Sequence, residues 1–372
     1  MQSDTRLIDI VAGARPNFMK IAALIKALDT ARDNRRNLDY RFVHTGQHYD
    51  KNMSGNFLEQ LGIPTPTVNF GVGSGTQAEQ TSAIMIAYEK LLEVKKPGVC
   101  LVVGDVNSTL ACAIAAQKGH VPVAHVEAGI RSGDWRMPEE INRLVTDAIT
   151  NWFFTTSRHA NKNLLNAGVP EDRIFFVGNT MIDTLFAQLD RISAPSYFSE
   201  KGLSRGAYLL MTLHRPSNVD YGKKLAEILT AVVEGAGGVP VVFPMHPRTR
   251  SVFEMLGGSY NNLIIVEPQA YHQFIFLMSN AKGVITDSGG ITEETTVLGV
   301  PCATLRATTE RPETIEIGTN ELVGERPDDI RDAVRRMACG KWKKGGVPEL
   351  WDGRAAERIV QHLDHLLYRV RS

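Results

Sequence analysis

Three carboxylates stand at positions where acidic side chains are able to move protons. Asp105 and Glu127 each follow an apolar, strand-like stretch, and Glu139 lies in the first turn of a helical pattern. Taken singly, Asp105 suits a helix cap, and Glu139 suits a first helical turn with Arg143 four residues on. A carboxylate at the end of a buried strand, however, needs a partner or a function. Since clustered carboxylates shift one another's pKa and divide acid and base roles, we predict general acid–base catalysis.

Cations follow the first predicted strand. The turn Gly13-Ala14-Arg15-Pro16 leads into a helix, and Lys20 follows within two turns. A phosphate at this helix start would meet both cations and the free backbone amides. The ordinary alternative is a turn with a surface arginine. The turn lacks the G-x-G-x-x-G pattern, so we do not expect a nicotinamide cofactor.

A second set of polar groups follows strands in the other half of the chain. The run Ser288-Gly289-Gly290 comes after a strand and opens a helix, which would turn amides and a hydroxyl toward a diphosphate. Glu294, one turn on, is placed to hold a ribose diol. His214 and His246 follow two further strands at equivalent positions. One such histidine is more often structural, but two indicate a site.

The elements that position these groups alternate between short β-branched runs and amphipathic helices. The predicted strands form a first series at residues 7–11, 41–45, 99–103, 121–126, 152–156 and 174–177, and a second at 207–212, 239–243, 263–266, 283–286 and 301–305. Strands that are apolar throughout are typical of parallel sheets covered on both faces. The alternation predicts α/β folding by right-handed βαβ units, with ligands at the carboxyl ends of the strands.

The two series are separated by a change of composition. Residues 190–206 are rich in Ser and Gly with one Pro, which is typical of a linker. We therefore predict two doubly wound domains with a cleft between them, one over residues 1–190 and one over 206–352. An apolar stripe along residues 356–370 predicts a final helix.

Composition excludes several classes of function. The chain has 372 residues, and its 41 basic residues balance its 41 acidic residues, which argues against a nucleic acid partner. The apolar runs are too short to span a membrane and no signal-peptide pattern is present, so we expect a soluble, cytoplasmic protein. The four cysteines lack metal-ligand spacing, so we expect neither a disulfide nor a zinc site.

Nine short motifs are spread over nearly the whole chain. They are Gly13-Ala14-Arg15-Pro16, Thr45-Gly46-Gln47-His48, Gly104-Asp105, His125-Val126-Glu127-Ala128-Gly129, Pro138-Glu139-Glu140 with Asn142-Arg143, Gly178-Asn179-Thr180, His214-Arg215, Asp287-Ser288-Gly289-Gly290 and Thr309-Glu310-Arg311-Pro312-Glu313. In type and order this set resembles the non-hydrolysing UDP-N-acetylglucosamine 2-epimerases. The resemblance implies a GT-B-like fold of two Rossmann-like domains, with a final helix over residues 353–372 packing back on the N-terminal domain.

The resemblance also implies an activity. Members of this family interconvert UDP-GlcNAc and UDP-ManNAc by losing UDP to form a bound 2-acetamidoglucal and then adding UDP back. No cofactor and no metal would be needed. The enzyme would be a cytoplasmic homodimer that supplies precursors for surface polysaccharides, and its partner would be a UDP-sugar.

Motif positions imply a role for each site residue. Asp105, Glu127 and Glu139 match the family's acid/base set, and His214 matches its active-site histidine, next to the diphosphate. The remaining matches imply substrate binding by Arg15, Lys20, Phe274, Ser288, Gly289, Gly290, Glu294 and Arg311, with Glu294 on the ribose and Phe274 near the uracil.

Other activities remain open at this point. Some relatives act on modified UDP-sugars such as UDP-2,3-diacetamido-2,3-dideoxy-glucuronate, and a hydrolysing epimerase would release free ManNAc. A GT-B glycosyltransferase would share the fold and the nucleotide site but would not need three clustered carboxylates. A sensor would bind the nucleotide sugar without turnover.

Overall fold

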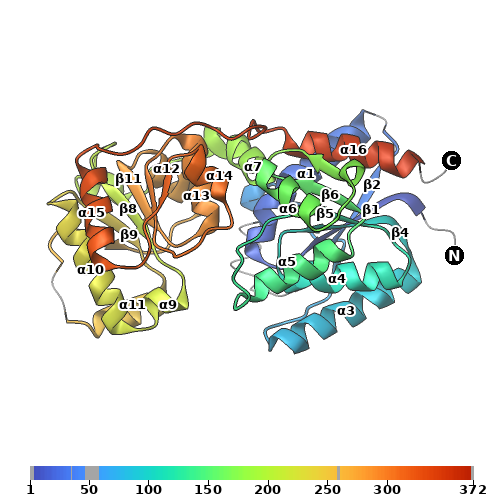
Figure 1. The fold of residues 1–372 in the computed structure, drawn as a ribbon, viewed down its shortest axis with the longest axis horizontal. Helices are drawn as coiled ribbons and strands as arrows, with labels where there is room; N and C mark the ends of the chain where they lie inside the picture. Colours follow the sequence, from blue (N-terminus) through green and yellow to red (C-terminus); the bar gives the residue numbers. More distant parts are fainter. Residues whose placement is uncertain (1–3, 35, 47–57, 258–259, 370–372) are drawn as a thin grey trace. The chain divides into compact units, whose positions relative to one another are not determined.

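The computed structural model describes residues 4–34, 36–46, 58–257 and 260–369. The chain divides into two compact units (Figure 1). Unit 1 holds residues 1–187 and 349–372, and unit 2 holds residues 188–348. Each unit is built on one parallel β-sheet, so the expected pair of doubly wound α/β domains is confirmed.

The sheet of unit 1 has seven strands in the order β3-β2-β1-β4-β5-β6-β7, all parallel. The strands are β1 (Asp4–Ala12), β2 (Asp39–His44), β3 (Val68–Asn69), β4 (Pro97–Val103), β5 (Val123–Val126), β6 (Trp152–Thr155) and β7 (Ile174–Phe176). All seven residues of β4 are buried, as expected for a central strand covered on both faces. The edge strand β3 was not expected, because two residues are too few to show a periodic pattern.

Helices cover both faces of this sheet. They are α1 (Arg15–Asp33), α3 (Gln77–Val94), α4 (Asn107–Lys118), α5 (Pro138–Ala148), α6 (Arg158–Asn166), α7 (Thr180–Gln188) and α16 (Ala355–Arg369). Figure 1 shows α3, α4 and α5 below the sheet and α1 with α16 above it. Tyr88 of α3 and Cys112 of α4 pack in the core between this lower layer and the sheet. Unit 1 is therefore a three-layer sandwich.

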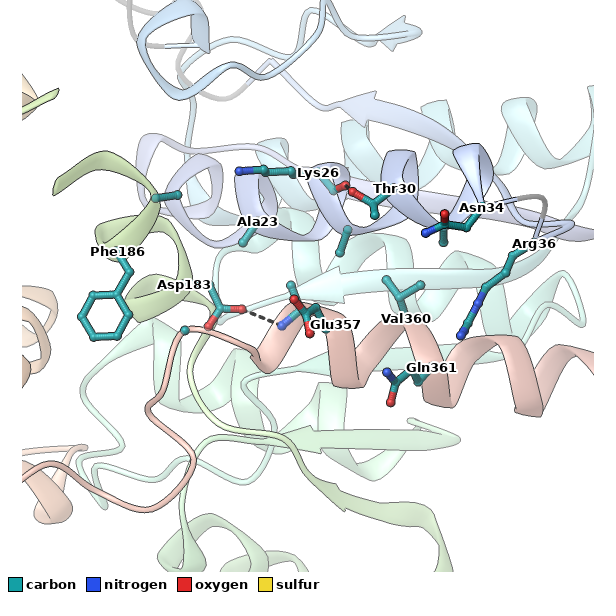
Figure 2. A pocket seen from close by; sticks show the side chains of 15 residues that line it. Ala23, Lys26, Thr30, Asn34, Arg36, Asp183, Phe186, Glu357, Val360 and Gln361 are labelled. Atoms are coloured by element: carbon teal, nitrogen blue, oxygen red, sulfur yellow. Dashed lines mark hydrogen bonds between the residues drawn. The ribbon is translucent and has the colours of Figure 1, made fainter. Parts of the chain in front are cut away.

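The chain returns to unit 1 through α16, which packs along α1. Asp183 of α7 caps α16, because its two carboxylate oxygens accept hydrogen bonds from the amides of Ala355 (3.1 Å) and Ala356 (2.6 Å). Figure 2 shows Asp183 directed at the first turn of α16, beside a cavity of about 400 Å³ walled by α1, α7 and α16. Burial raises the pKa of Asp183 to about 6.

The sheet of unit 2 has six parallel strands in the order β10-β9-β8-β11-β12-β13. The strands are β8 (Leu209–Thr212), β9 (Val241–Pro244), β10 (Leu263–Val266), β11 (Gly283–Thr286), β12 (Cys302–Thr304) and β13 (Asn320–Leu322). The three-residue edge strand β13 was not expected. The central strands β8 and β11 are wholly buried, and they end beside each other with Thr212 paired to Thr286.

The helices of unit 2 complete a second α/β unit. They are α8 (Tyr197–Glu200), α9 (Pro216–Val219), α10 (Gly222–Ala236), α11 (Pro247–Glu254), α12 (Tyr271–Ser279), α13 (Gly289–Leu298), α14 (Pro312–Glu316) and α15 (Pro327–Ala338). Leu229 of α10 and Val334 of α15 join the buried cluster that packs against β8, β9 and β11. No helix in the described part of the chain is long and apolar enough to cross a membrane.

The segment 190–206, which composition marks as a linker, is instead part of unit 2. Phe198 of α8 is buried, and its ring packs edge-on against Tyr208 at 5.7 Å and Phe276 at 5.2 Å between centroids. The amide of Gly206 donates to the carbonyl of Asn280. The packing of this one buried aromatic side chain holds the segment on unit 2. The small and polar residues around it therefore led to the incorrect prediction of a linker. Unit 2 begins at residue 188 and ends at 348, against the expected 206 and 352.

Candidate functional site

The turn between β1 and α1 lies at the carboxyl edge of the unit 1 sheet. The side-chain oxygen of Asn17 accepts hydrogen bonds from the amides of Gly13 (3.3 Å) and Ala14 (3.1 Å), and its nitrogen donates to the carbonyl of Val103 at the end of β4 (2.9 Å). Gly13 is required here because a Cβ would lie 1.9 Å from Ser108 Oγ. The turn is therefore locked to the neighbouring strand end. The side chain of Arg15 lies outside the described part of the structure.

Lys20 and Glu127 form an ion pair between α1 and the end of β5. Both side chains are largely buried, and Gly104 lies against them: a Cβ on Gly104 would be 3.2 Å from Lys20 Nζ and 3.5 Å from Glu127 Oε2. The expected role of Lys20 in substrate binding stays a prediction; in the structure its ammonium pairs with the Glu127 carboxylate. The pair joins α1 to the end of β5.

Glu127 has a left-handed backbone, with a φ of +73°. Residues other than glycine rarely adopt this conformation, which costs free energy and persists only where the surroundings hold it. The amides of Glu127 and Ala128 both donate to the carbonyl of Phe154 on β6. Backbone strain at a buried carboxylate is a feature of functional sites rather than of ordinary strand ends.

Asp105 follows β4 and is held by α5. The Nε and Nη2 atoms of Arg143 lie 3.0 and 2.6 Å from Asp105 Oδ2, and the side-chain amide of Asn142 donates to the carbonyl of Asp105 at 2.8 Å. The same guanidinium donates from Nη1 to Glu140 Oε2 at 2.8 Å. The expected pair between Glu139 and Arg143 is thus wrong. Arg143 lies with Glu140 on the face of α5 that is turned to the sheet edge, and it pairs with Glu140 instead of Glu139.

Glu140 and Glu139 have different environments although they are neighbours. Glu140 is buried and accepts from the amides of Ser132 (2.8 Å) and Gly133 (3.2 Å) as well as from Arg143. Burial opposes ionisation of Glu140, but these hydrogen bonds outweigh it and lower its pKa. Glu140 is therefore a structural carboxylate, whereas Glu139 is half-exposed at the start of α5.

In unit 2, Asp287 positions the histidine loop. Its carboxylate accepts hydrogen bonds from the amides of His214 (2.9 and 3.1 Å) and Arg215 (2.9 Å) and from the side chain of Asn218 (2.9 Å). The loop after β8 is thereby fixed to the end of β11. Burial lowers the pKa of His214, with Asp287 opposing and His246 reinforcing this shift, so the neutral imidazole is favoured.

The run Ser288-Gly289-Gly290 begins α13 at this same sheet edge. The amide of Ser288 donates to Thr286 Oγ1 at 3.0 Å, and the half-exposed first turn of α13 presents the positive end of the helix dipole. A Cβ on Gly289 would lie 3.0 Å from Glu310 Oε1. The absence of a side chain at Gly289 therefore lets the loop that leads to Arg311 pack closely against the start of α13. Arg311 pairs with Glu293 of α13 through Nε at 2.5 Å.

Glu294 is buried in α13 and receives a hydrogen bond from Tyr271. The distance from Tyr271 Oη to Glu294 Oε1 is 3.1 Å, and burial raises the pKa of Glu294 to about 7 although the tyrosine lowers it. Phe274, half-exposed, lies one turn after Tyr271 on α12. A carboxylate and an aromatic ring beside a helix N-terminus suit a nucleoside diphosphate.

Within each unit, the structure brings the expected residues to one sheet edge. Unit 1 gathers Lys20, Asp105 and Glu127 with the helix start that carries Glu139, and unit 2 gathers His214, Phe274, Ser288, Gly289, Gly290, Glu294 and Arg311. Gln47 and His48 of the second motif lie outside the described residues.

Sequence reasoning missed the supporting residues Asn17, Asp147 and Tyr271, and it gave no role to His125 and Asp287 although both stand in the quoted motifs. The amphipathic pattern of α5 gave the opposite prediction: Glu140, Arg143 and Asp147 lie at helical spacing on a face that the structure buries, whereas the apolar Ile141 and Val145 are exposed. A charged stripe on a buried face indicates paired side chains with a role.

The chain is similar to known proteins over nearly its whole length. Residues 30–364 match the family described as UDP-N-acetylglucosamine 2-epimerase. The UDP-N-acetylglucosamine 2-epimerase of Methanocaldococcus jannaschii is 40% identical over 97% of this chain and 100% of its own. The UDP-2,3-diacetamido-2,3-dideoxy-D-glucuronate 2-epimerase of Pseudomonas aeruginosa is 39% identical over 96% of this chain and 99% of its own.

A solved structure extends the likeness to the fold. The crystal structure of the M. jannaschii UDP-GlcNAc 2-epimerase in complex with UDP-GlcNAc and UDP aligns with a TM-score of 0.84, covering 96% of this chain and 99% of that one. The likeness spans the sheets of both units, so the expected GT-B-like class is confirmed.

Proposed function

Because this chain belongs to the UDP-N-acetylglucosamine 2-epimerase family, we propose that it interconverts UDP-GlcNAc and UDP-ManNAc. One observation carries the proposal. Asp105 and Glu127 stand at adjacent strand ends, next to the helix start that bears Glu139, so three carboxylates can serve one sugar carbon. A nucleotide-binding protein without isomerase activity has no need of such an arrangement.

The chemistry of the sugar sets what these groups must do. The hydrogen on C2 has no adjacent carbonyl to acidify it, so direct removal of the proton is slow. When the C1–O bond breaks as a base takes the C2 proton, the electron pair leaves with UDP and 2-acetamidoglucal remains. Protonation of C2 from the opposite face and return of UDP to C1 then give the epimer. Acid and base groups are therefore needed on two faces of one carbon.

Unit 1 supplies these groups in the proposal. Asp105, Glu127 and Glu139 share the proton transfers, and the ammonium of Lys20 pairs with the Glu127 carboxylate. Arg15 and Lys20 add positive charge near the reacting sugar. Arg143 orients Asp105 through two nitrogens on a single oxygen, which leaves the carboxylate little rotational freedom.

Unit 2 binds UDP in the proposal. The amides at the start of α13, with Ser288, Gly289 and Gly290, hold the diphosphate, and Arg311 and the neutral His214 stabilise the charge that develops on the leaving group. Glu294 accepts hydrogen bonds from the ribose hydroxyls, and Phe274 packs against the uracil. These roles are supported by the position of every group at the carboxyl edge of one sheet.

Proton NMR in deuterium oxide tests the activity directly. The purified protein, given UDP-GlcNAc alone, is expected to form a mannose-configured nucleotide sugar that carries deuterium at C2. Unchanged UDP-GlcNAc would contradict the proposal and favour a glycosyltransferase or a sensor. Accumulation of free ManNAc and UDP would instead assign the chain to the hydrolysing epimerases.

A second substrate is favoured by one comparison. The P. aeruginosa relative, which is named for UDP-2,3-diacetamido-2,3-dideoxy-D-glucuronate, is as similar to this chain as the UDP-GlcNAc enzyme of M. jannaschii. Measuring kcat/KM for both sugars separates the two candidates. We expect UDP-GlcNAc to be preferred; a large preference for the diacetamido uronate would transfer the assignment to that substrate.

We further propose that the protein is a cytoplasmic homodimer that supplies ManNAc-type precursors for surface polysaccharides. Support for the homodimer comes from apolar side chains exposed on two helices that both pack on α4, namely Ile86 of α3 with Ile141 and Val145 of α5. Light scattering is expected to give twice the chain mass of 41.0 kDa. Ile141→Asp is expected to give the single mass.

A further inference from the structure

A buried histidine behind the acid/base residues is bound at both ring nitrogens. His125 lies on β5 with 1% of its surface exposed. Its Nδ1 is 2.8 Å from Asp147 Oδ1 on α5, and its Nε2 is 2.8 Å from the carbonyl oxygen of Gly104. Gly104 directly precedes Asp105, and His125 stands two residues before Glu127. The ring therefore connects the two strand ends that carry carboxylates.

Asp147 extends this connection to the loop that follows Glu127. Its Oδ2 accepts a hydrogen bond from the amide of Gly129 at 3.0 Å and another from Arg131 Nη1 at 2.6 Å. His125 and Asp147 together thus hold residue 104 on one side and residues 129 and 131 on the other. Four segments meet at this pair: the ends of β4 and β5, the loop after β5, and α5.

The partners of the ring hold it at both nitrogens. The carbonyl oxygen of Gly104 only accepts, so Nε2 of His125 donates to it, while Nδ1 lies against Asp147 Oδ1. Burial opposes ionisation of Asp147, but the hydrogen bonds from His125 and Arg131 prevail and lower its pKa. The ring of His125 is therefore tied to a carboxyl on one side and to the backbone before Asp105 on the other.

The loops that the pair holds are conformationally demanding. Gly104, Glu127 and Gly129 all have left-handed backbones, with φ values of +69°, +73° and +78°. Glycine adopts this conformation freely, but Glu127 does not. A backbone of this kind keeps its shape only where neighbouring contacts over-determine it, and the pair contacts residues on both sides of Glu127.

We infer that His125 and Asp147 are positioning residues that hold Asp105 and Glu127 in their reactive geometry, by fixing the carbonyl of Gly104 and the amide of Gly129 to one hydrogen-bonded pair. The inference rests on the acid/base roles proposed above. It goes beyond them because neither residue touches substrate in the proposal. Since a displacement of about 1 Å at a reacting group costs on the order of 100-fold in rate, releasing the pair should lower kcat strongly.

A cavity behind the pair makes a direct test possible. A pocket of about 300 Å³ between α5 and α6 is lined by Asp147 itself, by Leu144, Phe153 and Leu164, and by two cations, Arg131 and Arg173. In Asp147→Ala the lost carboxylate leaves space that adjoins this pocket. Formate, a one-carbon carboxylate, can enter there and take the place of the Asp147 side chain beside His125 and Arg131.

The experiment measures kcat, KM and UDP affinity for Asp147→Ala with and without formate. We expect kcat to fall by about 30-fold or more, with UDP affinity within about twofold of the unaltered protein, because the UDP-binding residues belong to unit 2. Formate should restore a substantial part of kcat, in a saturable manner. Chloride at the same ionic strength should restore none, and His125→Phe should not respond to formate.

Tyr88→Phe is the matched control. It also removes a hydrogen bond from a buried carboxylate of the same sheet, since Tyr88 Oη donates to Asp9 Oδ2 at 2.9 Å, but Asp9 lies in register with Cys100 in the middle of β4 rather than at the strand end that carries Asp105. This variant should lose stability and keep its kcat. A folded Asp147→Ala protein with unchanged kcat would overturn the inference, and so would a loss that formate does not reverse.

These variants test the positioning role of His125 and Asp147 separately from the acid/base roles of Asp105 and Glu127. If Asp105→Asn and Glu127→Gln are inactive while Asp147→Ala is fully active, only the positioning role is wrong. If Asp105→Asn and Glu127→Gln are themselves active, the proposed mechanism fails whatever the behaviour of Asp147→Ala.

Discussion

The guanidinium of Arg143 binds one oxygen of Asp105 with two nitrogens, Nε at 3.0 Å and Nη2 at 2.6 Å, while its third nitrogen holds Glu140. A planar fork with three directed donors is a geometry that only arginine provides. The orientation of a carboxylate in the candidate site thus depends on a cation from the buried face of α5.

Replacing this arginine tests that dependence. Arg143→Lys keeps the positive charge but cannot serve Asp105 and Glu140 together, so we expect kcat to fall by roughly 10- to 100-fold with little change in KM. Steady-state kinetics on UDP-GlcNAc measure this. Arg136→Lys is the control, because Arg136 also binds an aspartate, Asp134, through two nitrogens but is exposed. Equal losses in both variants would contradict the orienting role.

The three carboxylates themselves should be needed for turnover and not for nucleotide binding. Asp105→Asn, Glu127→Gln and Glu139→Gln are each expected to lower kcat by at least ~100-fold, the lower end for loss of a general acid or base. UDP affinity, measured by calorimetry, should stay near normal in each. Near-normal turnover in any one of them would remove that residue from the acid/base set. The exposed Glu89→Gln serves as the neutral control.

Glu294 predicts a pH dependence of nucleoside binding. Its pKa is raised to about 7, and the ribose hydroxyls need the ionised carboxylate as acceptor. Uridine affinity should therefore rise with pH up to about 7 and level off above it, falling up to about tenfold per unit on the acidic side. Inhibition constants of uridine between pH 5.5 and 8.5 measure this, and the nucleoside avoids the titration of phosphate.

Two variants distinguish Glu294 from other titrating groups. Glu294→Gln should bind uridine more weakly and with no pH dependence in this range. Tyr271→Phe removes the hydrogen bond that lowers the pKa of Glu294, so the midpoint should move to higher pH. A midpoint that stays in place in both variants would assign the titration to a different residue.

Asp183 predicts a pH dependence of stability. Its pKa is about 6 in the folded protein against 3.8 for the free side chain, so the folded state binds the proton more tightly than the unfolded state. Asp183 therefore favours folding most below about pH 4, and this contribution is lost as the pH rises to about 6. The free energy of unfolding in urea, taken as the difference between the unaltered protein and Asp183→Asn, should decline over that interval. A difference in the free energy of unfolding that does not change with pH would contradict this prediction.

Local patterns in the sequence were sufficient for much of this protein. The apolar runs of β1, β4, β5, β8 and β11 are visible in the sequence because burial on both faces leaves few polar residues within them, Asp9 and His125 being the buried charged or ionisable exceptions in β1 and β5. Since the parallel strands of one sheet end at the same edge, Asp105 and Glu127 were predicted at the carboxyl edge of the first sheet and His214 at that of the second. The motif set then indicated the family.

Pairing between side chains was decided only by the tertiary structure. Spacing in the sequence pairs Arg143 with Glu139, whereas the packing of α5 on the sheet edge pairs it with Glu140. The pairing of Lys20 with Glu127 and that of His125 with Asp147 join residues that are far apart in the chain. Residues 190–206 were misread because one buried ring, Phe198, outweighs their polar composition. Periodicity and strand order are local properties, whereas partner choice depends on which elements meet in space, and that information is not carried by any single stretch of sequence.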